Sequence, residues 1–253
     1  MERINFKNFV FVLIISIVFS FVFSPVVFGA KKKSQSKHKI EFVTKDKFIL
    51  VGDLYLSPSQ SQKPLVVCLH SFSLNALAWS NLAKALQHKG YNVLAMDLRG
   101  HGRSVYNENL KLKSRYKFSN SDWQKLPNDV IESIAYIKSH YPHINCNNII
   151  FVGADVGASA GVIAGNSLNP KPSKFVMVSP MLNFKGLYIP IKVANYTNTK
   201  FLVILSKSDK ILFNFYTKDK PIIIKYPIGG PGNQLLKVNP SSVSDIVNFI
   251  AAP

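Results

Sequence analysis

The chain has 253 residues, 47% of them hydrophobic, and carries a formal net charge of +18. This apolar content is enough for one well-buried domain or at most two small ones, so an array of large domains is excluded. A charge of this size would suit an anionic partner such as acidic lipid or a cell-wall polymer. Beyond residue 40, however, the lysines are scattered and form no nucleic-acid motif, which favours an ordinary lysine-rich surface and predicts no nucleic-acid partner.

Residues 1–29 have the layout of a secretory signal: a basic start, the uncharged apolar run 9–23, and small residues that favour cleavage after Gly29. The apolar stretch nearly reaches the length that spans a bilayer, so an uncleaved membrane anchor is the alternative. Residues 30–39 (AKKKSQSKHK) predict a basic, disordered linker. Since basic residues on that side of an apolar segment tend to stay cytoplasmic, the orientation of such an anchor stays open. We expect an exported protein, either secreted or held in the cell envelope.

Residues 40–253 alternate between short apolar runs and amphipathic stretches and predict one domain. A hairpin is predicted at 40–44 and 48–56, strands at 65–70, 91–97, 148–153, 174–179, 201–206 and 221–226, helices at 76–89, 127–140 and 156–168, and a last helix opening at Asn239-Pro240. The stretch 105–122 has no clear period and predicts a mobile excursion. This order indicates an α/β fold with a mostly parallel sheet, whose site lies beyond the carboxyl ends of the strands.

The only two cysteines are Cys68 and Cys146. Cys68 falls near the top of one predicted strand and Cys146 below the foot of its neighbour, a separation on the order of 20 Å at ~3.3 Å per residue. We therefore expect two free thiols. The sequence has no His-rich stretch and no paired-carboxylate spacing, so we expect neither a metal site nor a cofactor.

Residues 69–104, LHSFSLNALAWSNLAKALQHKGYNVLAMDLRGHGRS, resemble the α/β-hydrolase superfamily. The resemblance continues through VGADVGASAG, VMVSPMLNFKGL and VILSKSDKIL, and looks closest to small bacterial esterase- or lysophospholipase-like members with a minimal cap. It implies the α/β-hydrolase fold, with helices on both faces of the sheet and an N-terminal β-hairpin. It also implies acyl-transfer chemistry by a nucleophile on a strained strand-to-helix elbow, a histidine base and an orienting carboxylate.

The stretch GADVGASAG (153–161) contains two overlapping frames, of which only the second matches the G-x-S-x-G pattern of serine hydrolases. The elbow directly follows its strand, and the predicted strand ends at Gly153, which places Asp155 at the tip. If Ser159 were the tip, Asp155 would be buried among apolar neighbours in the strand, which is costly. We therefore predict Asp155 at the elbow and Ser159 as a small residue packed within the following helix.

The resemblance assigns the other site positions, and one of them breaks the family pattern. Asp209, just past a strand, falls at the position of the acid, whereas Pro231 in GGPGNQLL takes the position of the histidine. The oxyanion donors would be amides near Ser71 or Phe72 and at Val156. An ionised Asp155 would be able to fill this oxyanion hole with its own carboxylate.

We expect none of the other histidines to replace the missing base. His70 and His101 lie at the active edge of the predicted sheet, but in the family these positions shape the oxyanion and neighbouring loops, so we expect structural roles. No histidine follows His143. Loss of a general base is typically worth ~10²–10⁴-fold in rate and stops turnover where the base must regenerate the enzyme.

Three hypotheses follow. The first is an exported hydrolase-like protein that has lost ester hydrolysis and binds an unknown small molecule or envelope component. The second is an active hydrolase of esters, epoxides or haloalkanes with Asp155 as nucleophile, since the resemblance extends to epoxide hydrolases and haloalkane dehalogenases, which use an elbow aspartate. The third is a cationic binder of anionic envelope polymers or lipids, at a membrane or cell-wall surface.

Overall fold

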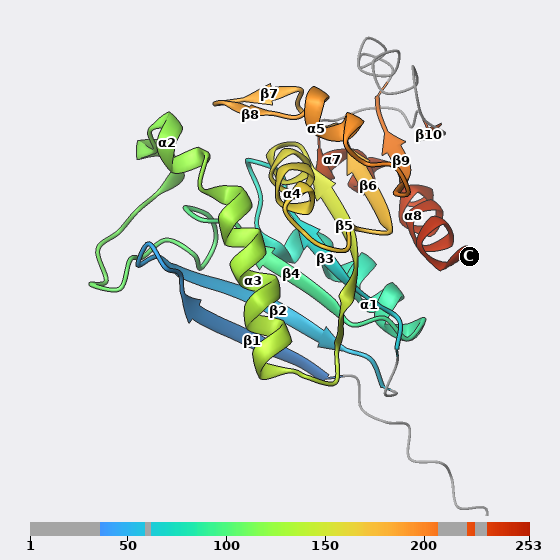
Figure 1. The fold of residues 1–253 in the computed structure, drawn as a ribbon, viewed down its shortest axis with the longest axis horizontal. Helices are drawn as coiled ribbons and strands as arrows, with labels where there is room; N and C mark the ends of the chain where they lie inside the picture. Colours follow the sequence, from blue (N-terminus) through green and yellow to red (C-terminus); the bar gives the residue numbers. More distant parts are fainter. Residues whose placement is uncertain (1–35, 59–61, 207–221, 226–231) are drawn as a thin grey trace, which may run out of the picture. The chain divides into compact units, whose positions relative to one another are not determined.

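The described strands form an eight-stranded sheet in the order β1-β2-β4-β3-β5-β6-β9-β10 (Figure 1). The computed structural model describes residues 36–58, 62–206, 222–225 and 232–253. The strands of the sheet are β1 (Ser36–Val43), β2 (Ile49–Leu56), β3 (Pro64–Leu69), β4 (Val93–Asp97), β5 (Asn145–Ala154), β6 (Lys174–Val178), β9 (Lys200–Ile204) and β10 (Ile222–Lys225). All neighbours from β4 to β10 are parallel, which confirms the predicted α/β fold.

The first two strands form the predicted hairpin, and β2 pairs antiparallel with β4. The strand β1 starts at Ser36, so the expected boundary at residue 40 is wrong by four residues. Residues 36–39 pair in register with residues 53–56 of β2, and Lys37 Nζ lies 3.3 Å from Asp53 Oδ2. These pairings order the end of the expected linker, whereas the rest of it and residues 1–29 lie outside the described residues. None of the described helices is long and apolar enough to cross a membrane.

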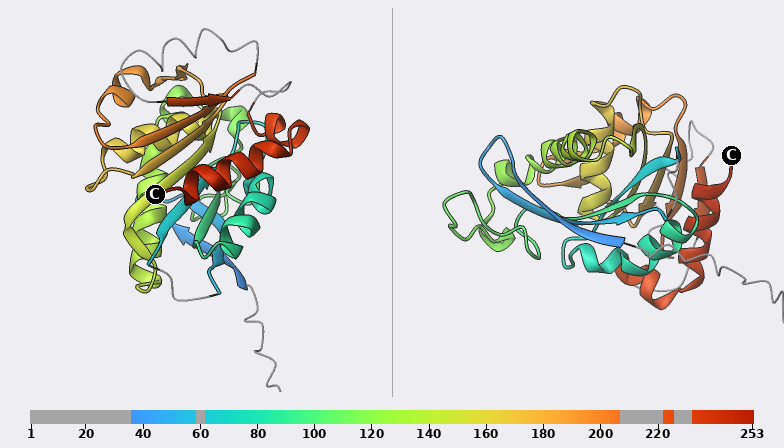
Figure 2. Two further views of the ribbon diagram at one scale, coloured as in Figure 1. Left: turned by 90° about the vertical axis from the view of Figure 1, so that its right-hand side faces the viewer. Right: turned by 90° about the horizontal axis from the view of Figure 1, so that it is seen from below.

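Two helix layers cover the sheet on opposite faces (Figure 2). The helices are η1 (Ala76–Trp79), α1 (Ser80–His88), η2 (Arg115–Lys117), α2 (Asn120–Trp123), α3 (Leu126–His140), α4 (Val156–Asn166), α5 (Pro190–Ala194), α7 (Asn233–Val238) and α8 (Ser241–Ala251). Helices α3 and α4 share one core with Val67, Leu69 and Phe151, whereas η1, α1 and α8 share the other with Val66 and Cys68. Successive strand residues thus face alternate layers, as the pleat requires. The stretch 105–122, predicted without structure, contains η2 and the start of α2.

Both cysteines are free thiols, as predicted. Cys68 is buried in the middle of the sheet opposite Val152, whereas Cys146 lies at the first residues of β5. Burial raises the pKa of Cys146 to about 11 and that of Cys68 further. Both thiols therefore stay protonated at neutral pH and are poor nucleophiles.

Candidate functional site

Asp155 lies at the tip of a sharp turn between the end of β5 and the start of α4. Its backbone has φ 53° and ψ −123°, a conformation that side-chain-bearing residues rarely adopt. Such strain persists where the surrounding structure enforces it, and it clusters at functional sites. Asp155 thus lies between the last residue of β5 and the first residue of α4, the position that the sequence predicted for the elbow.

The small residues around the elbow let α4 pack closely against the sheet. A Cβ atom added to Gly153 would lie 2.5 Å from the Cα of Ala158, and one added to Gly157 would collide with the carbonyl oxygen of Leu69. Ser159 is fully buried and its hydroxyl donates to the carbonyl of Met181 over 2.9 Å. The motif-matching serine is therefore part of the helix packing, as predicted.

The carboxylate of Asp155 lies at the amides predicted as oxyanion donors. The Phe72 N–H donates to Asp155 Oδ2 over 3.1 Å, and the backbone amide of Val156, the next residue, also lowers the pKa of this carboxylate. Burial raises the pKa of Asp155, and the two amides oppose this shift only in part. Because a pKa raised by folding means tighter proton binding in the folded state, the contribution of this group to stability declines as pH rises through that pKa.

Of the two alternative donors after β3, the Phe72 amide faces the elbow carboxylate, whereas the Ser71 amide points elsewhere. The Ser71 amide donates to Asn233 Oδ1 over 2.9 Å, and the Ser71 hydroxyl donates to the same oxygen over 3.2 Å. These two hydrogen bonds hold the loop after β3 against the start of α7. The sequence places the Gly229–Asn233 loop at the same edge of the sheet but did not predict this contact, because the two residues are 162 positions apart in the chain.

All six histidines fall within the described residues, and none bonds to the elbow carboxylate. His70 donates from Nδ1 to the Ser71 carbonyl over 2.8 Å and accepts at Nε2 from the Leu98 amide over 2.9 Å. Both ring nitrogens of His101 lie 2.9 Å from main-chain carbonyls, one of them that of Phe72. Burial lowers the pKa of both rings, that of His70 to about 3. The remaining four are exposed: His38, His88, His140 and His143.

The segment that precedes α7 reaches the elbow. Gly232 has φ 55°, and a Cβ atom at this position would lie 2.8 Å from the Cβ of Ser71 and 3.4 Å from the Cβ of Asp155. The residue after Pro231 thus lies beside the elbow. Pro231 itself and Asp209 lie outside the described residues, so their assignment to the histidine and acid positions stays a prediction.

An aromatic cluster that the sequence did not reveal adjoins the elbow through Phe72. The Phe72 ring centroid lies 5.5 Å from that of Trp123 and 5.9 Å from that of Phe184, and Trp123 lies 5.4 Å from Phe118. Phe184 belongs to a short hairpin, β7 (Asn183–Phe184) and β8 (Leu187–Tyr188), inserted after β6. This hairpin and α5 lie beyond the carboxyl ends of β5 and β6 (Figure 1), where the resemblance implies a minimal cap.

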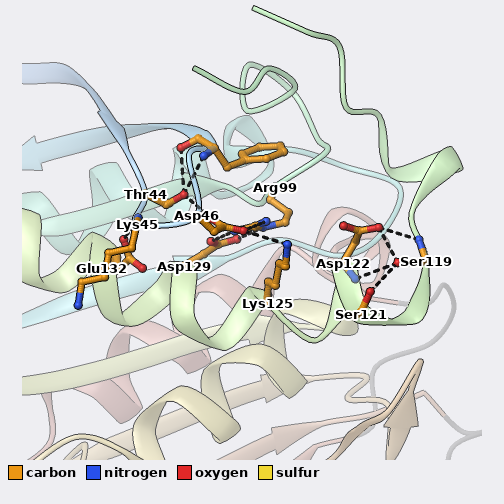
Figure 3. Close-up of polar contacts among 11 residues, drawn as sticks. Thr44, Lys45, Asp46, Arg99, Ser119, Ser121, Asp122, Lys125, Asp129 and Glu132 are labelled. Carbon is orange, nitrogen blue, oxygen red and sulfur yellow. Dashed lines mark hydrogen bonds and ion pairs between the residues drawn. The ribbon is translucent and has the colours of Figure 1, made fainter. Parts of the chain in front are cut away.

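The loop after β4 is held by a buried ion-pair network around Arg99, as Figure 3 shows. Arg99 makes two hydrogen bonds to Asp129 of α3, at 2.7 and 2.5 Å, and two to Asp46 of the β1–β2 turn, at 2.8 and 2.9 Å. Lys125 also contacts Asp46, over 3.1 Å. Burial raises the pKa of Asp129 to about 6, so it is ionised at neutral pH, and the hydrogen bonds from Arg99 lower that of Asp46.

A groove of about 890 Å³ lies between η1 and α1 on one side and α7 and α8 on the other. Its lining is mainly apolar and includes Leu74, Leu77 and Leu236, together with Asn233. The Nδ2 of Asn233 is buried and has no hydrogen-bond partner in the part of the chain that the structure describes. Within that same part, no group of three or more His, Cys, Asp or Glu residues is arranged to hold a metal ion.

The strand order, the elbow after β5 and the insertion after β6 define an α/β-hydrolase. Residues 60–227, well over half of the chain, match the family model of the serine aminopeptidases, S33. The chain therefore belongs to this family of the α/β-hydrolase superfamily. The family description names a serine, whereas the elbow of this chain carries Asp155.

Solved structures share this fold. An esterase of Pyrococcus furiosus has a TM-score of 0.65 and 19% identity, over 87% of this chain and 92% of that one. A CIB-like hydrolase of Thermoplasma acidophilum has a TM-score of 0.66 and 14% identity, over 86% of this chain and 99% of that one. At these identities the likeness shows the fold alone.

Two curated proteins match shorter stretches. Epoxide hydrolase B of Mycobacterium tuberculosis is 48% identical over 48 residues, which cover 19% of this chain and 14% of that protein. A monoglyceride lipase homolog of monkeypox virus is 26% identical over 129 residues, which cover 51% of this chain and 42% of that protein. The chain thus matches less than half of the length of either relative.

Proposed function

We propose that this chain is an exported α/β-hydrolase-fold protein that does not hydrolyse esters and acts as a binding or interaction module. The observation that carries the proposal is the hydrogen bond from the Phe72 amide to Asp155 Oδ2. In ester hydrolysis these amides stabilise the negative oxygen that develops on the substrate. Here a carboxylate takes that place, and its charge repels a second oxyanion.

The positions of the histidines support the same proposal. His70 and His101 have both ring nitrogens engaged by main-chain groups, and burial disfavours the protonated form that a general base must reach. Pro231 has no side chain that accepts a proton. A covalent intermediate on Asp155 would therefore have no group to activate the water that releases it.

We propose that the binding module holds its ligand in the groove between α1 and α7. Its apolar walls suit a hydrocarbon portion, and the unpartnered Asn233 amide suits a hydrogen-bond acceptor such as a carbonyl. Asn233 also bonds to Ser71 beside the elbow, so occupancy of the groove would act on the former oxyanion loop. Export is supported by the signal-like layout of residues 1–29.

We expect residues 34–253, which form a compact unit of their own, to show no turnover of short-chain p-nitrophenyl esters. The measurement is the steady-state release of nitrophenol, with Asp155→Asn as the matched control. The expected result is that protein and control give the same background rate. Turnover that disappears in Asp155→Asn would overturn the proposal, because it would show that the elbow carboxylate performs chemistry.

A second candidate function is alkyl transfer to Asp155, favoured by the 48% identity over 48 residues to an epoxide hydrolase. The Phe72 amide holds Oδ2, which leaves Oδ1 free to attack an epoxide carbon. The ester bond forms as the C–O bond of the ring breaks, and the released oxygen takes a proton from water. Without a base the ester would persist. Mass spectrometry after incubation with a panel of epoxides and haloalkanes separates the two candidates: a stoichiometric adduct on Asp155 supports alkyl transfer, and its absence supports the binding module.

A further inference from the structure

Residues 105–117, which follow the loop after β4, present a small hairpin at the surface. The Lys113 amide donates to the Val105 carbonyl over 2.7 Å, and the Asn107 amide donates to the Lys111 carbonyl over 3.2 Å. The hairpin is fixed to the β1–β2 turn, since the Ile49 amide donates to the Tyr106 carbonyl over 2.9 Å. Figure 1 shows this green segment beside that turn. We call residues 105–117 the surface hairpin.

The surface hairpin exposes an unusual amount of apolar side chain. Leu110, Leu112 and Tyr116 are 73%, 61% and 76% exposed, and Tyr106 is 43% exposed. Single exposed apolar residues need no explanation, but several gathered on one segment mark an interaction surface. These four fall within eleven consecutive residues.

Leu110 at the tip of the hairpin is unfavourable in two ways. Its φ of 56° places a branched side chain in the left-handed region, where glycine or asparagine would be relaxed. Leu110 is also the most exposed leucine among the described residues. The Leu110 amide donates to the Asn107 carbonyl over 2.9 Å, which closes the turn, but the side chain stays exposed to water. An exposed leucine at this position is better explained by a contact made outside the described chain.

Cations alternate with these apolar residues. Lys111, Lys113 and Lys117 are exposed and take part in no ion pair with any described residue. The one acidic residue of the hairpin, Glu108, is paired with Lys47 over 3.1 Å. The guanidinium of Arg115 lies over the rings of Tyr116 and Phe72. The surface hairpin is therefore strongly basic.

We propose that the surface hairpin docks this domain onto an anionic lipid bilayer. Its lysines pair with the headgroups, while the leucine and tyrosine side chains enter the boundary between headgroups and acyl chains. An anionic polymer would satisfy the lysines but would leave the apolar tip in water. The combination therefore favours a membrane over a nucleic acid or a cell-wall polymer, and it is independent of the chemistry at the elbow.

The test is co-sedimentation of residues 34–253 with vesicles of phosphatidylcholine, with and without phosphatidylglycerol. Binding is expected only where phosphatidylglycerol is present. The double variant Leu110→Asn/Leu112→Ser should bind about tenfold more weakly, and Lys111→Ser should also bind more weakly. The matched controls are Ile191→Ser and Lys84→Ser, which alter exposed side chains on α5 and α1, outside the groove, and should leave binding unchanged.

Folding of the variants is checked by thermal unfolding, where Leu110→Asn alone should be at least as stable as the parent because its backbone strain is relieved. Three results would overturn the proposal. One is the absence of binding to either vesicle. Another is full binding by Leu110→Asn/Leu112→Ser with weakened binding by Lys111→Ser, which would indicate a purely electrostatic site for an anionic polymer. The third is an equal loss in the control variants.

Discussion

Replacement of Arg99 by methionine is expected to lower the free energy of unfolding by about 3–5 kcal/mol. The side chain is 3% exposed and is the shared partner of two carboxylates, so its removal leaves the charge of Asp129 buried without compensation. The network also joins three segments, the β1–β2 turn, the loop after β4 and α3, which lose their common contact. Urea unfolding of residues 34–253 at neutral pH measures the change.

Two further variants show whether the buried charge is the cause. Lys125→Met removes another contact to Asp46, but this pair is exposed and should cost at most about 1 kcal/mol. Arg99→Met/Asp129→Leu should regain part of the stability lost in the single variant, because no uncompensated charge remains in the interior. A double variant as unstable as Arg99→Met would contradict this explanation.

The second large effect is expected in Asp155→Ser/Pro231→His, which restores both residues that the family pattern requires. We expect ester hydrolysis at least about 10²-fold faster than in either single variant, the lower end of what a positioned base supplies. The amides of Phe72 and Val156 would then be free to bind a substrate oxyanion. The expectation rests on the family pattern and on Gly232, whose position lies beside the Cβ atoms of Ser71 and Asp155.

Ser159→Ala in the background of this double variant is the matched control. Ser159 is buried in α4 and bonds to a carbonyl, so its replacement should leave the restored activity intact. Loss of the activity on Ser159→Ala would show that the G-x-S-x-G frame is the working one. A double variant no faster than the single ones would contradict the prediction that position 231 and the elbow still form one site.

The sequence predicted the parts of the structure that depend on local pattern. The buried strands lie where apolar runs predicted them, and the amphipathic helices lie where the spacing of apolar residues predicted them. The position of the elbow was predicted from a strand end at Gly153, one residue short of the observed end of β5. The free-energy cost of burying the Asp155 carboxylate within a strand favoured the first of the two frames, with Asp155 rather than Ser159 at the turn. Such arguments succeed because each needs only neighbouring residues.

Contacts between distant segments were missed. Asn233 accepts a hydrogen bond from the Ser71 amide, 162 positions away in the chain. The aromatic cluster joins residues from the loop after β3, from α2 and from the β7–β8 hairpin. The start of β1 was misplaced because AKKKSQSKHK has the composition of a linker, yet its last residues pair with β2. In each case a contact between distant segments decides the local structure. Such a contact leaves no trace in the composition or periodicity of either segment.

We infer that the carboxylate of Asp155 fills the oxyanion hole of its own elbow. The most direct measurement is an NMR pH titration of the Phe72 and Val156 backbone amides in residues 34–253, compared with Asp155→Asn. Because burial raises the pKa of Asp155, both amides should shift together with a midpoint above the usual aspartate value, and this shift should be absent in Asp155→Asn. Amide signals that do not change over this pH range in the unmutated domain would contradict the claim.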